Sequence, residues 1–351
     1  MEAKELVMSD LLSIDGSFGE GGGQIIRTSV SLAAMTGRAI EVYNVRARRS
    51  KPGLQPQHVA AVRAAAAICQ AQLTGDSVGS TYFRFEPQCP VVAGNYHFEI
   101  GTAGATPLVV QTVLLPLALA TGASTVRVTG GTHVPHSPPA EYLEAVYVPA
   151  LKSVGLDVAF SYESAGFYPR GGGEVNVRVG GSGVIQPLEW RESGTLQEIR
   201  AFIVTANLPD HVAKRGAETV ERHIKGIKLE NRKKTSLGPG AATVIVARGE
   251  SGLGGFSAIG AKNKPMEQVA EEPALEFLNW KKSGAACDEH LADQLVLPLA
   301  FASGPSHWTT AIVTEHLRTV IWVVQQFLDV EARIEENTDG GGMVLMSPHR
   351  S

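Results

Sequence analysis

The chain has few cysteines and no long unbroken hydrophobic run, and both absences exclude classes of protein. Its three cysteines, Cys69, Cys89 and Cys287, are widely spaced and form no CxxC pair. This pattern argues against a disulfide framework or a zinc cluster, and it fits a reducing compartment. The longest apolar run, Pro107–Ala120, contains polar residues and is too short to span a bilayer.

The N-terminus and the charge balance exclude further classes. The stretch Met1–Ser13 is charged and lacks the apolar segment of a signal peptide. A net charge of −4 argues against a protein that coats nucleic acid generally, but it does not exclude a local basic patch. With 351 residues, 44% of them hydrophobic and 19% charged, we expect a soluble, cytoplasmic, globular protein of two domains without membrane contact.

The stretch Trp308–Leu328 combines a β-branched strand, Thr309–Val313, with a predicted helix from about Glu315 to Leu328. Thr314 suits the N-cap of this helix. The buried face is predicted from residues at helical spacing, namely Leu317, Val320, Ile321, Val324, Phe327 and Leu328. His316 falls in the first turn, where the helix dipole favours a neutral imidazole and a bound phosphate. It is therefore a candidate nucleophile toward phosphorus, although a first-turn histidine more often only caps or packs.

A glycine-rich loop, Ile14–Gly23, leads into another predicted helix. The loop lacks the Lys-Ser/Thr of a P-loop and the spacing of GxGxxG, so neither nucleotide fingerprint applies. Its glycines allow close approach of a ligand, with Glu20, Gln24 and Arg27 nearby. A plain glycine-rich turn with solvated charges is an equally good interpretation of this segment alone.

A basic loop occupies Arg46–His58. No acidic residue occurs between Glu41 and Asp76, although this interval contains five cationic residues, namely Arg46, Arg48, Arg49, Lys51 and Arg63. Such runs are usually solvated, but prolines stiffen this one, and Gln57 and His58 follow at a helix start. We therefore favour a preorganised anion site.

Polar residues inside apolar segments are further candidates. Gln111 is a lone amide in the predicted helix Leu108–Ala120, and Asp293 and Gln294 lie among leucines and valines. Each is either a hydrogen-bonded core residue or a ligand contact. His133 and His136 are a weak metal pair, because no third ligand is apparent.

The composition changes near Gly180–Gly183. Between Leu188 and Ser283 the pattern predicts a small α/β module with a basic segment, His223–Lys234, and an acidic one, Glu267–Glu276. A composition rich in apolar residues, like that of the first half, returns near residue 285. We therefore predict an α/β protein whose large domain comprises residues 1–187 and 285–351, with a small α/β domain inserted at residues 188–284. Triple glycines at Gly21–Gly23, Gly171–Gly173 and Gly340–Gly342 hint at a repeated unit.

Seven segments, in this order, resemble the RNA 3′-terminal phosphate cyclase family. They are Asp15–Arg27, Arg46–His58, Gly101–Gly104, Gly130–Pro139, Phe167–Gly173, His290–Gln294 and Thr314–His316. The resemblance spans nearly the whole chain. It implies a large domain of repeated βαβαββ-type units, each a sheet with two helices, interrupted by a small α/β insert.

The resemblance also implies a reaction. The histidine matching His316 attacks the α-phosphorus of ATP and forms a histidine–AMP intermediate. The AMP passes to an RNA 3′-phosphate, and the vicinal 2′-hydroxyl then closes a 2′,3′-cyclic phosphodiester.

The implied roles extend to further residues. Glu20 matches the ligand of a divalent metal, Mg²⁺ or Mn²⁺. The positions implied to bind ATP are Gln111, His290, Leu291, Ala292, Asp293 and Gln294. The positions implied to bind phosphates or the RNA end are Gln24, Arg27, Arg46, Arg49, Gln57 and His58. RNA with a 3′-phosphate and ATP are the implied partners, and a homodimer is the one assembly considered.

Two alternatives stand beside this interpretation. A catalytically silent relative, binding RNA in ribosome biogenesis, would keep the fold but would not need His316. An enolpyruvyl transferase has similar repeated α/β units, but it would form no covalent nucleotide adduct.

Overall fold

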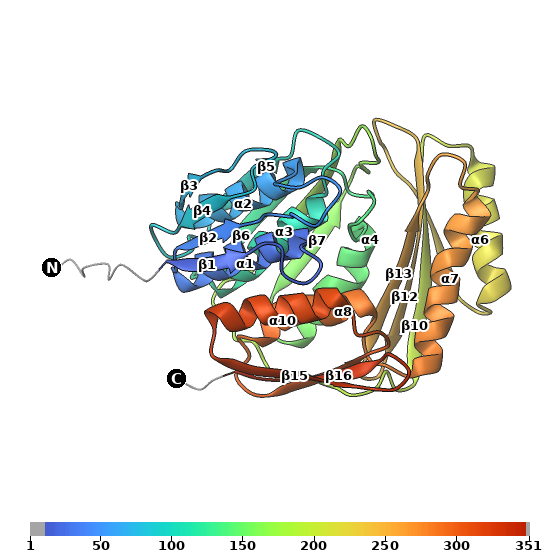
Figure 1. The fold of residues 1–351 in the computed structure, drawn as a ribbon. Coiled ribbons are helices and arrows are strands. Elements are labelled where there is room, and N and C mark those ends of the chain that lie inside the picture. Colours follow the sequence, from blue (N-terminus) through green and yellow to red (C-terminus); the bar gives the residue numbers. More distant parts are fainter. Residues whose placement is uncertain (1–10, 349–351) are drawn as a thin grey trace.

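Residues 11–348 are described by the structure, which is a computed structural model. Residues 1–10 and 349–351 lie outside the described residues; they include most of the stretch Met1–Ser13 and the outer ends of the predicted large domain. Between residues 11 and 348 the chain has the predicted mixed α/β character, with four four-stranded sheets and helices packed on them (Figure 1).

The first sheet has the strand order β1-β2-β4-β3, with β1 parallel to β2 and the other pairs antiparallel. The strands are β1 Leu12–Asp15, β2 Ile40–Tyr43, β3 Gln72–Thr74 and β4 Phe83–Glu86. Its helices are α1 (Gly23–Thr36) and α2 (Pro56–Cys69). The face that helical spacing predicts for α1 is buried, namely Ile25, Ile26, Ser29, Leu32 and Ala33.

The second sheet has the order β5-β6-β8-β7, again with one parallel pair, β5 and β6. Its strands are β5 Asn95–Glu99, β6 Ser124–Gly130, β7 Val158–Tyr162 and β8 Gly173–Val179. The helix α3 (Thr106–Leu119) joins β5 to β6. Between β6 and β7 the chain forms three consecutive helical pieces, α4 (Ala140–Tyr142), the π-helical η1 (Leu143–Tyr147) and α5 (Val148–Ser153).

The third sheet has the order β15-β16-β14-β9, and its parallel pair is β9 and β14. Its strands are β9 Glu189–Trp190, β14 Ser306–Thr310, β15 Val330–Glu336 and β16 Gly342–Pro348. Its helices are α8 (Glu289–Gln294), α9 (Val296–Leu299) and α10 (Glu315–Phe327). The helix α10 packs against α1, so the C-terminal part of the chain lies beside the N-terminal part.

The fourth sheet has the order β11-β10-β12-β13. Its strands are β10 Leu196–Ala206, β11 Lys228–Lys233, β12 Gly240–Gly249 and β13 Leu253–Ile259. The helices α6 (Asp210–His223) and α7 (Met266–Ser283) cover its outer face (Figure 1). Along β10 the buried side chains alternate, with Ala201 and Ile203 in a core beneath α6 and α7, and Phe202 and Val204 in the main core.

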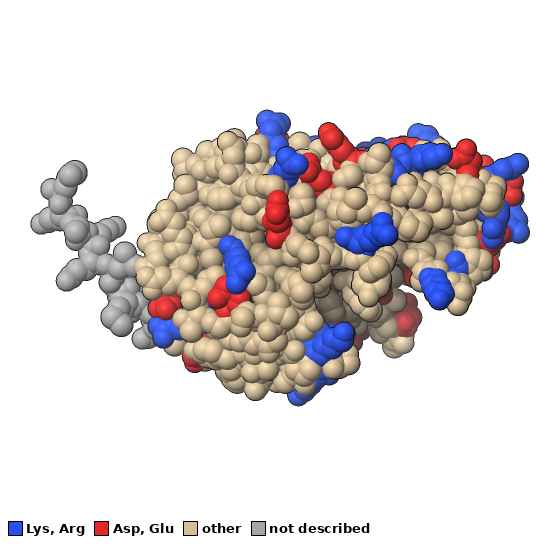
Figure 2. Space-filling view, turned by 90° about the horizontal axis from the view of Figure 1, so that it is seen from above, with Lys and Arg blue, Asp and Glu red and all other residues tan. Residues whose placement is uncertain are grey.

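The surface between this fourth sheet and the rest of the molecule is hollowed, and Lys and Arg side chains lie near the rim of the hollow (Figure 2). In the part of the chain that the structure describes, no helix is both long enough and apolar enough to cross a membrane.

Candidate active site

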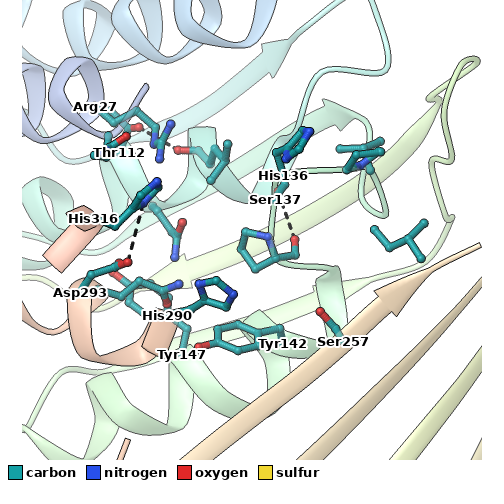
Figure 3. Close-up of a pocket in the computed structure, with 18 of the residues that line it drawn as sticks. Arg27, Thr112, His136, Ser137, Tyr142, Tyr147, Ser257, His290, Asp293 and His316 are labelled. Atoms are coloured by element: carbon teal, nitrogen blue, oxygen red, sulfur yellow. Dashed lines mark hydrogen bonds and ion pairs between the residues drawn. The ribbon is translucent and has the colours of Figure 1, made fainter. Parts of the chain in front are cut away.

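A cavity of about 620 Å³ collects side chains from helices, loops and a strand that are distant in sequence (Figure 3). Its lining includes residues of α1, α3, α8 and α10, the loop after β6 and the end of β13. The predicted site residues among them are Gln24, Arg27, Gln111, His290, Asp293, Gln294 and His316.

The position of His316 follows from the local sequence of α10. The Thr314 hydroxyl accepts a hydrogen bond from the Leu317 backbone N–H at 3.1 Å, which confirms the predicted N-cap. The helix therefore begins at Glu315 and holds His316 in its first turn, against the cavity. Burial lowers the pKa of His316 more than the neighbouring Glu20 raises it, so the imidazole is neutral near pH 7.

Two carboxylates face the two ring nitrogens of His316. Its Nδ1 lies 3.9 Å from Asp293 Oδ2 (Figure 3). Its Nε2 lies 3.1 Å from Glu20 Oε2. Burial raises the pKa of Asp293 to about 7, although His290 and Arg27 act in the opposite direction. A carboxyl group with a pKa near neutrality is suited to exchange protons with an adjacent imidazole.

The glycine loop brings Glu20 to His316. Gly19 and Gly21 have φ angles of 54° and 58°, which favour glycine. At Gly19 a Cβ atom would also lie 2.4 Å from Thr319 Oγ1 of α10. Both the backbone angle and the close approach of loop and helix therefore require glycine at this position. Arg48 Nη1 donates to the Gly19 carbonyl at 3.1 Å, and Arg49 Nη2 lies 2.7 Å from Glu20 Oε2.

Two arginines and a neutral histidine, namely Arg27, Arg46 and His58, lie near this loop. Burial lowers the pKa of Arg27 to about 10, which still leaves it cationic at neutral pH. Arg46 has a φ of 54°, and its buried Nε has no hydrogen-bond partner within residues 11–348. Burial, and then the charges of Arg27 and Arg46, lower the pKa of His58 to about 3, so His58 is neutral.

Three glutamine side chains in the cavity wall have buried polar atoms without a partner in the described part of the chain. These atoms are Gln24 Nε2 from α1, Gln111 Nε2 from α3 and Gln294 Oε1 from α8. Because buried polar atoms are normally hydrogen-bonded, their convergence on one cavity fits a polar ligand.

The structure does not bring every predicted residue into the cavity. Leu291 and Ala292 have fully buried side chains in the core and do not line it. Gln57 instead accepts a hydrogen bond from the Ala105 backbone N–H at 3.3 Å. His58 accepts one from the Gln55 N–H at 3.0 Å and caps α2.

The two loop histidines have separate environments. His133 is fully buried, with its Nε2 2.7 Å from Glu141 and its Nδ1 2.8 Å from Thr132 Oγ1. His136 lies at the cavity with a φ of 61°. Among residues 11–348 there is no group of three or more His, Cys, Asp or Glu side chains that would hold a metal ion.

The fit to a metal therefore depends on Glu20. Mg²⁺ is commonly held by one or two carboxylates together with substrate phosphates. Glu20 thus suits a cation that arrives with a nucleotide, but not a metal that the protein holds by itself.

Asp288 does not line the cavity, but it supports the cavity-lining residues Tyr142 and His290, and the sequence analysis missed it. Its buried carboxylate accepts from the backbone N–H groups of His290, Leu291 and Gly255 at 2.9, 3.0 and 2.9 Å, and from the Tyr142 hydroxyl at 3.0 Å. It thereby fixes α8 against β13 and α4. An Asp immediately before a helix is a known N-cap signal, so this residue was within reach of sequence reasoning.

Comparison with known proteins gives one consistent family. The model of the family described as "RNA 3'-terminal phosphate cyclase" matches residues 18–334. A protein of that name from Gloeothece citriformis is 42% identical over 328 residues, covering 90% of this chain and 93% of that protein. One from Methylococcus capsulatus is 45% identical over 339 residues, covering 93% and 94%.

A solved structure with a much weaker similarity is the enolpyruvyl transferase NikO from Streptomyces tendae. Its TM-score is 0.28 at 12% identity, over 49% of this chain and 33% of that one, which is too low to support an inference.

Proposed function

The chain belongs to the RNA 3′-terminal phosphate cyclase family, and we propose that it converts an RNA 3′-phosphate to a 2′,3′-cyclic phosphodiester at the expense of ATP. The observation that carries the proposal is a neutral histidine, His316, held between two carboxylates at a cavity. Three amide side chains of the cavity wall each have one buried atom without a partner among residues 11–348. This arrangement supplies a nucleophile, a proton acceptor and polar groups for a nucleotide in one place.

In the first proposed step, Nε2 of His316 attacks the α-phosphorus of ATP, the bond to the β-phosphate breaks, and pyrophosphate leaves. Glu20 must first turn away from Nε2, because its carboxylate occupies that side of the ring. Asp293 faces Nδ1 and is placed to take the imidazole proton as the new bond forms. The positive first turn of α10 stabilises the phosphate of the resulting histidine–AMP.

In the later proposed steps, the RNA 3′-phosphate displaces His316 from AMP, and the vicinal 2′-hydroxyl then attacks the activated phosphate and releases AMP. Arg27, Arg46 and Arg49 are the cations that would hold the phosphates. Gln24, Gln111 and Gln294 would bind the nucleotide. A divalent cation held by Glu20 and the ATP phosphates would neutralise charge on pyrophosphate.

We also propose that the chain consists of repeated α/β units interrupted by a small insert, and that it is cytoplasmic. The first three sheets share a strand order in which a parallel pair is followed by an antiparallel hairpin, which supports a repeated βαβαββ unit. The fourth sheet, with its own core under α6 and α7, supports a small insert, but β9 (Glu189–Trp190) pairs with β14 of the third sheet, so the insert begins after β9 and not at residue 188. Three free cysteines support a cytoplasmic location.

Labelling with ATP that carries a radioactive α-phosphate tests the function. We expect an acid-labile, alkali-stable labelled band, absent from His316→Ala, and conversion of a 3′-phosphorylated RNA to a cyclic end. A 3′-hydroxyl RNA of the same sequence is the control. A folded wild-type protein that neither labels nor cyclises would be the catalytically silent RNA-binding relative.

A further inference from the structure

An aromatic pair joins the glycine loop to the helix that carries the nucleophile. The rings of Phe18, in the loop, and Trp322, on α10, are stacked with centroids 3.9 Å apart and planes 9° apart. Trp322 follows His316 by six residues, or nearly two helical turns. Phe18 precedes Glu20 by two residues, so the pair lies beside the contact between Glu20 and His316.

The stacking contact is the main apolar anchor that the glycine loop can make. Between Gly16 and Gly23, Phe18 is the only large apolar side chain, and five of the eight residues are glycine. Glycine-rich backbone loses more conformational freedom on ordering than other sequences, so it needs an anchor to hold one geometry. Gly19, which follows Phe18, lies directly against Thr319, in the turn of α10 between His316 and Trp322.

Phe18 is poorly placed to serve the core. Its side chain is 39% exposed, and it stacks on a partly buried tryptophan instead of entering the main cluster of fully buried residues. Its stacking partner nevertheless belongs to the helix that holds His316. A contact of this kind contributes little to overall folding but fixes the loop relative to the nucleophile.

We propose that Phe18, stacked on Trp322, is a positioning residue that holds the glycine loop against α10, so that the Glu20 carboxylate stays within reach of the ATP phosphates when it turns away from His316 Nε2. The proposal rests on the function proposed above. Neither aromatic residue touches the reacting atoms, and both act through Glu20.

The test compares the rate constant of histidine adenylylation at saturating ATP for Phe18→Ala, Phe18→Tyr and wild type. Misplacement of a catalytic group by about 1 Å costs on the order of 100-fold, so we expect Phe18→Ala to lower the rate constant about 10- to 100-fold. The ATP concentration for half-maximal labelling should change little, because Gln24, Gln111 and Gln294 are untouched. Phe18→Tyr keeps the ring and should restore the rate.

Two controls separate positioning from general destabilisation. Tyr82→Ala removes an aromatic side chain that is also 39% exposed, and it should leave the rate constant unchanged. In the double variant Phe18→Ala/Trp322→Ala the rate should be no lower than in the slower single variant, because both changes break one contact.

Hydrogen exchange measured by mass spectrometry gives a readout that does not need activity. Phe18→Ala should speed exchange of the amides of residues 16–23 and leave β10 and β12 unchanged. Wild-type protein that fails to label would refute only the proposed function. The hydrogen-exchange rates of residues 16–23 in Phe18→Ala would still show whether Phe18 anchors the loop. Unchanged exchange and an unchanged rate in Phe18→Ala would overturn the inference. Loss of RNA-end binding without loss of adenylylation would also overturn it, and would make the pair a stacking surface for an RNA base.

Discussion

Replacement of Asp293 by asparagine should have two separable effects, one on stability and one on chemistry. In the folded protein burial raises the pKa of Asp293 to about 7, whereas its ordinary value is 3.8. Between these two values the folded protein keeps a proton that the unfolded chain releases. The free energy of unfolding therefore falls as the pH rises through this window, and it stays lowered above about pH 7.

The size of this effect follows from the same two values. The interval from 3.8 to about 7, at about 1.4 kcal/mol for each pH unit, corresponds to about 4 kcal/mol. Roughly two thirds of it lies above about pH 5, so the wild-type protein should lose on the order of 2–3 kcal/mol between about pH 5 and pH 8 from this group. Asp293→Asn has no proton to release and should not show this loss.

Urea unfolding at the two pH values measures the effect by linear extrapolation. Asp293→Asn should gain on the order of 2–3 kcal/mol relative to wild type on going from the lower to the higher pH. Asp157→Asn, a change of an exposed aspartate, is the matched control. Parallel pH profiles for Asp293→Asn and wild type would refute the assignment of a buried, neutral-range carboxyl group.

The chemical effect of the same variant has the opposite sign. An amide cannot take the proton of His316 Nδ1, which lies 3.9 Å from the Asp293 carboxylate. Loss of a general base typically costs about 10²- to 10⁴-fold in rate. We expect adenylylation to slow to that extent at about pH 8, where the variant is relatively more stable. An unchanged rate would exclude Asp293 as the proton acceptor.

Three further predictions concern other parts of the site and its support. Arg46→Ala or Arg49→Ala should weaken binding of a 3′-phosphorylated oligonucleotide about tenfold, because each removes a charge-assisted contact. Fluorescence anisotropy should show no such loss for the 3′-hydroxyl oligonucleotide of the same sequence. Equal losses for both oligonucleotides would mean that the arginines attract RNA only nonspecifically. Gln111→Ala should raise the ATP concentration for half-maximal labelling about 3- to 10-fold, with a smaller change in the maximal rate. Arg232→Ala should cost about 3 kcal/mol in urea unfolding, because Glu144 and the fully buried Glu141 lose a cationic neighbour at 2.5 and 3.8 Å; a cost below about 1 kcal/mol would show that the contact is dispensable.

The elements that carry local signals were predictable from the sequence. In α10 the N-cap Thr314 is confirmed, and Leu317, Val320, Ile321 and Val324 are buried as the spacing predicts. Both signals depend only on residues within a few turns of one another. The shortest strands gave no such signal, since β3 has three residues and β9 only two. They exist because a longer neighbouring strand pairs with them.

The contacts that make the site were beyond local reasoning. Glu20 and His316 are almost 300 positions apart in the chain, and the packing of α1 against α10 brings their segments together. The resemblance placed both residues in one site, but it did not indicate that the carboxylate faces Nε2. His133 was considered as a metal ligand, and its pairing with Glu141 follows from the fold of the loop after β6, not from a spacing rule.

The unpartnered amides distinguish a ligand site from ordinary imperfections of packing. Buried atoms without partners also occur at five other described residues, none of which is part of this cavity wall, namely Ser29, Arg46, Arg84, Thr243 and Trp280. Gln24, Gln111 and Gln294 come from three different helices and meet at one cavity. Each unsatisfied buried group costs about 1–3 kcal/mol, and a nucleotide that bonds to all three would remove the whole cost at once. Independent packing defects would not be expected to converge on one cavity, whereas the polar groups of a ligand site would be.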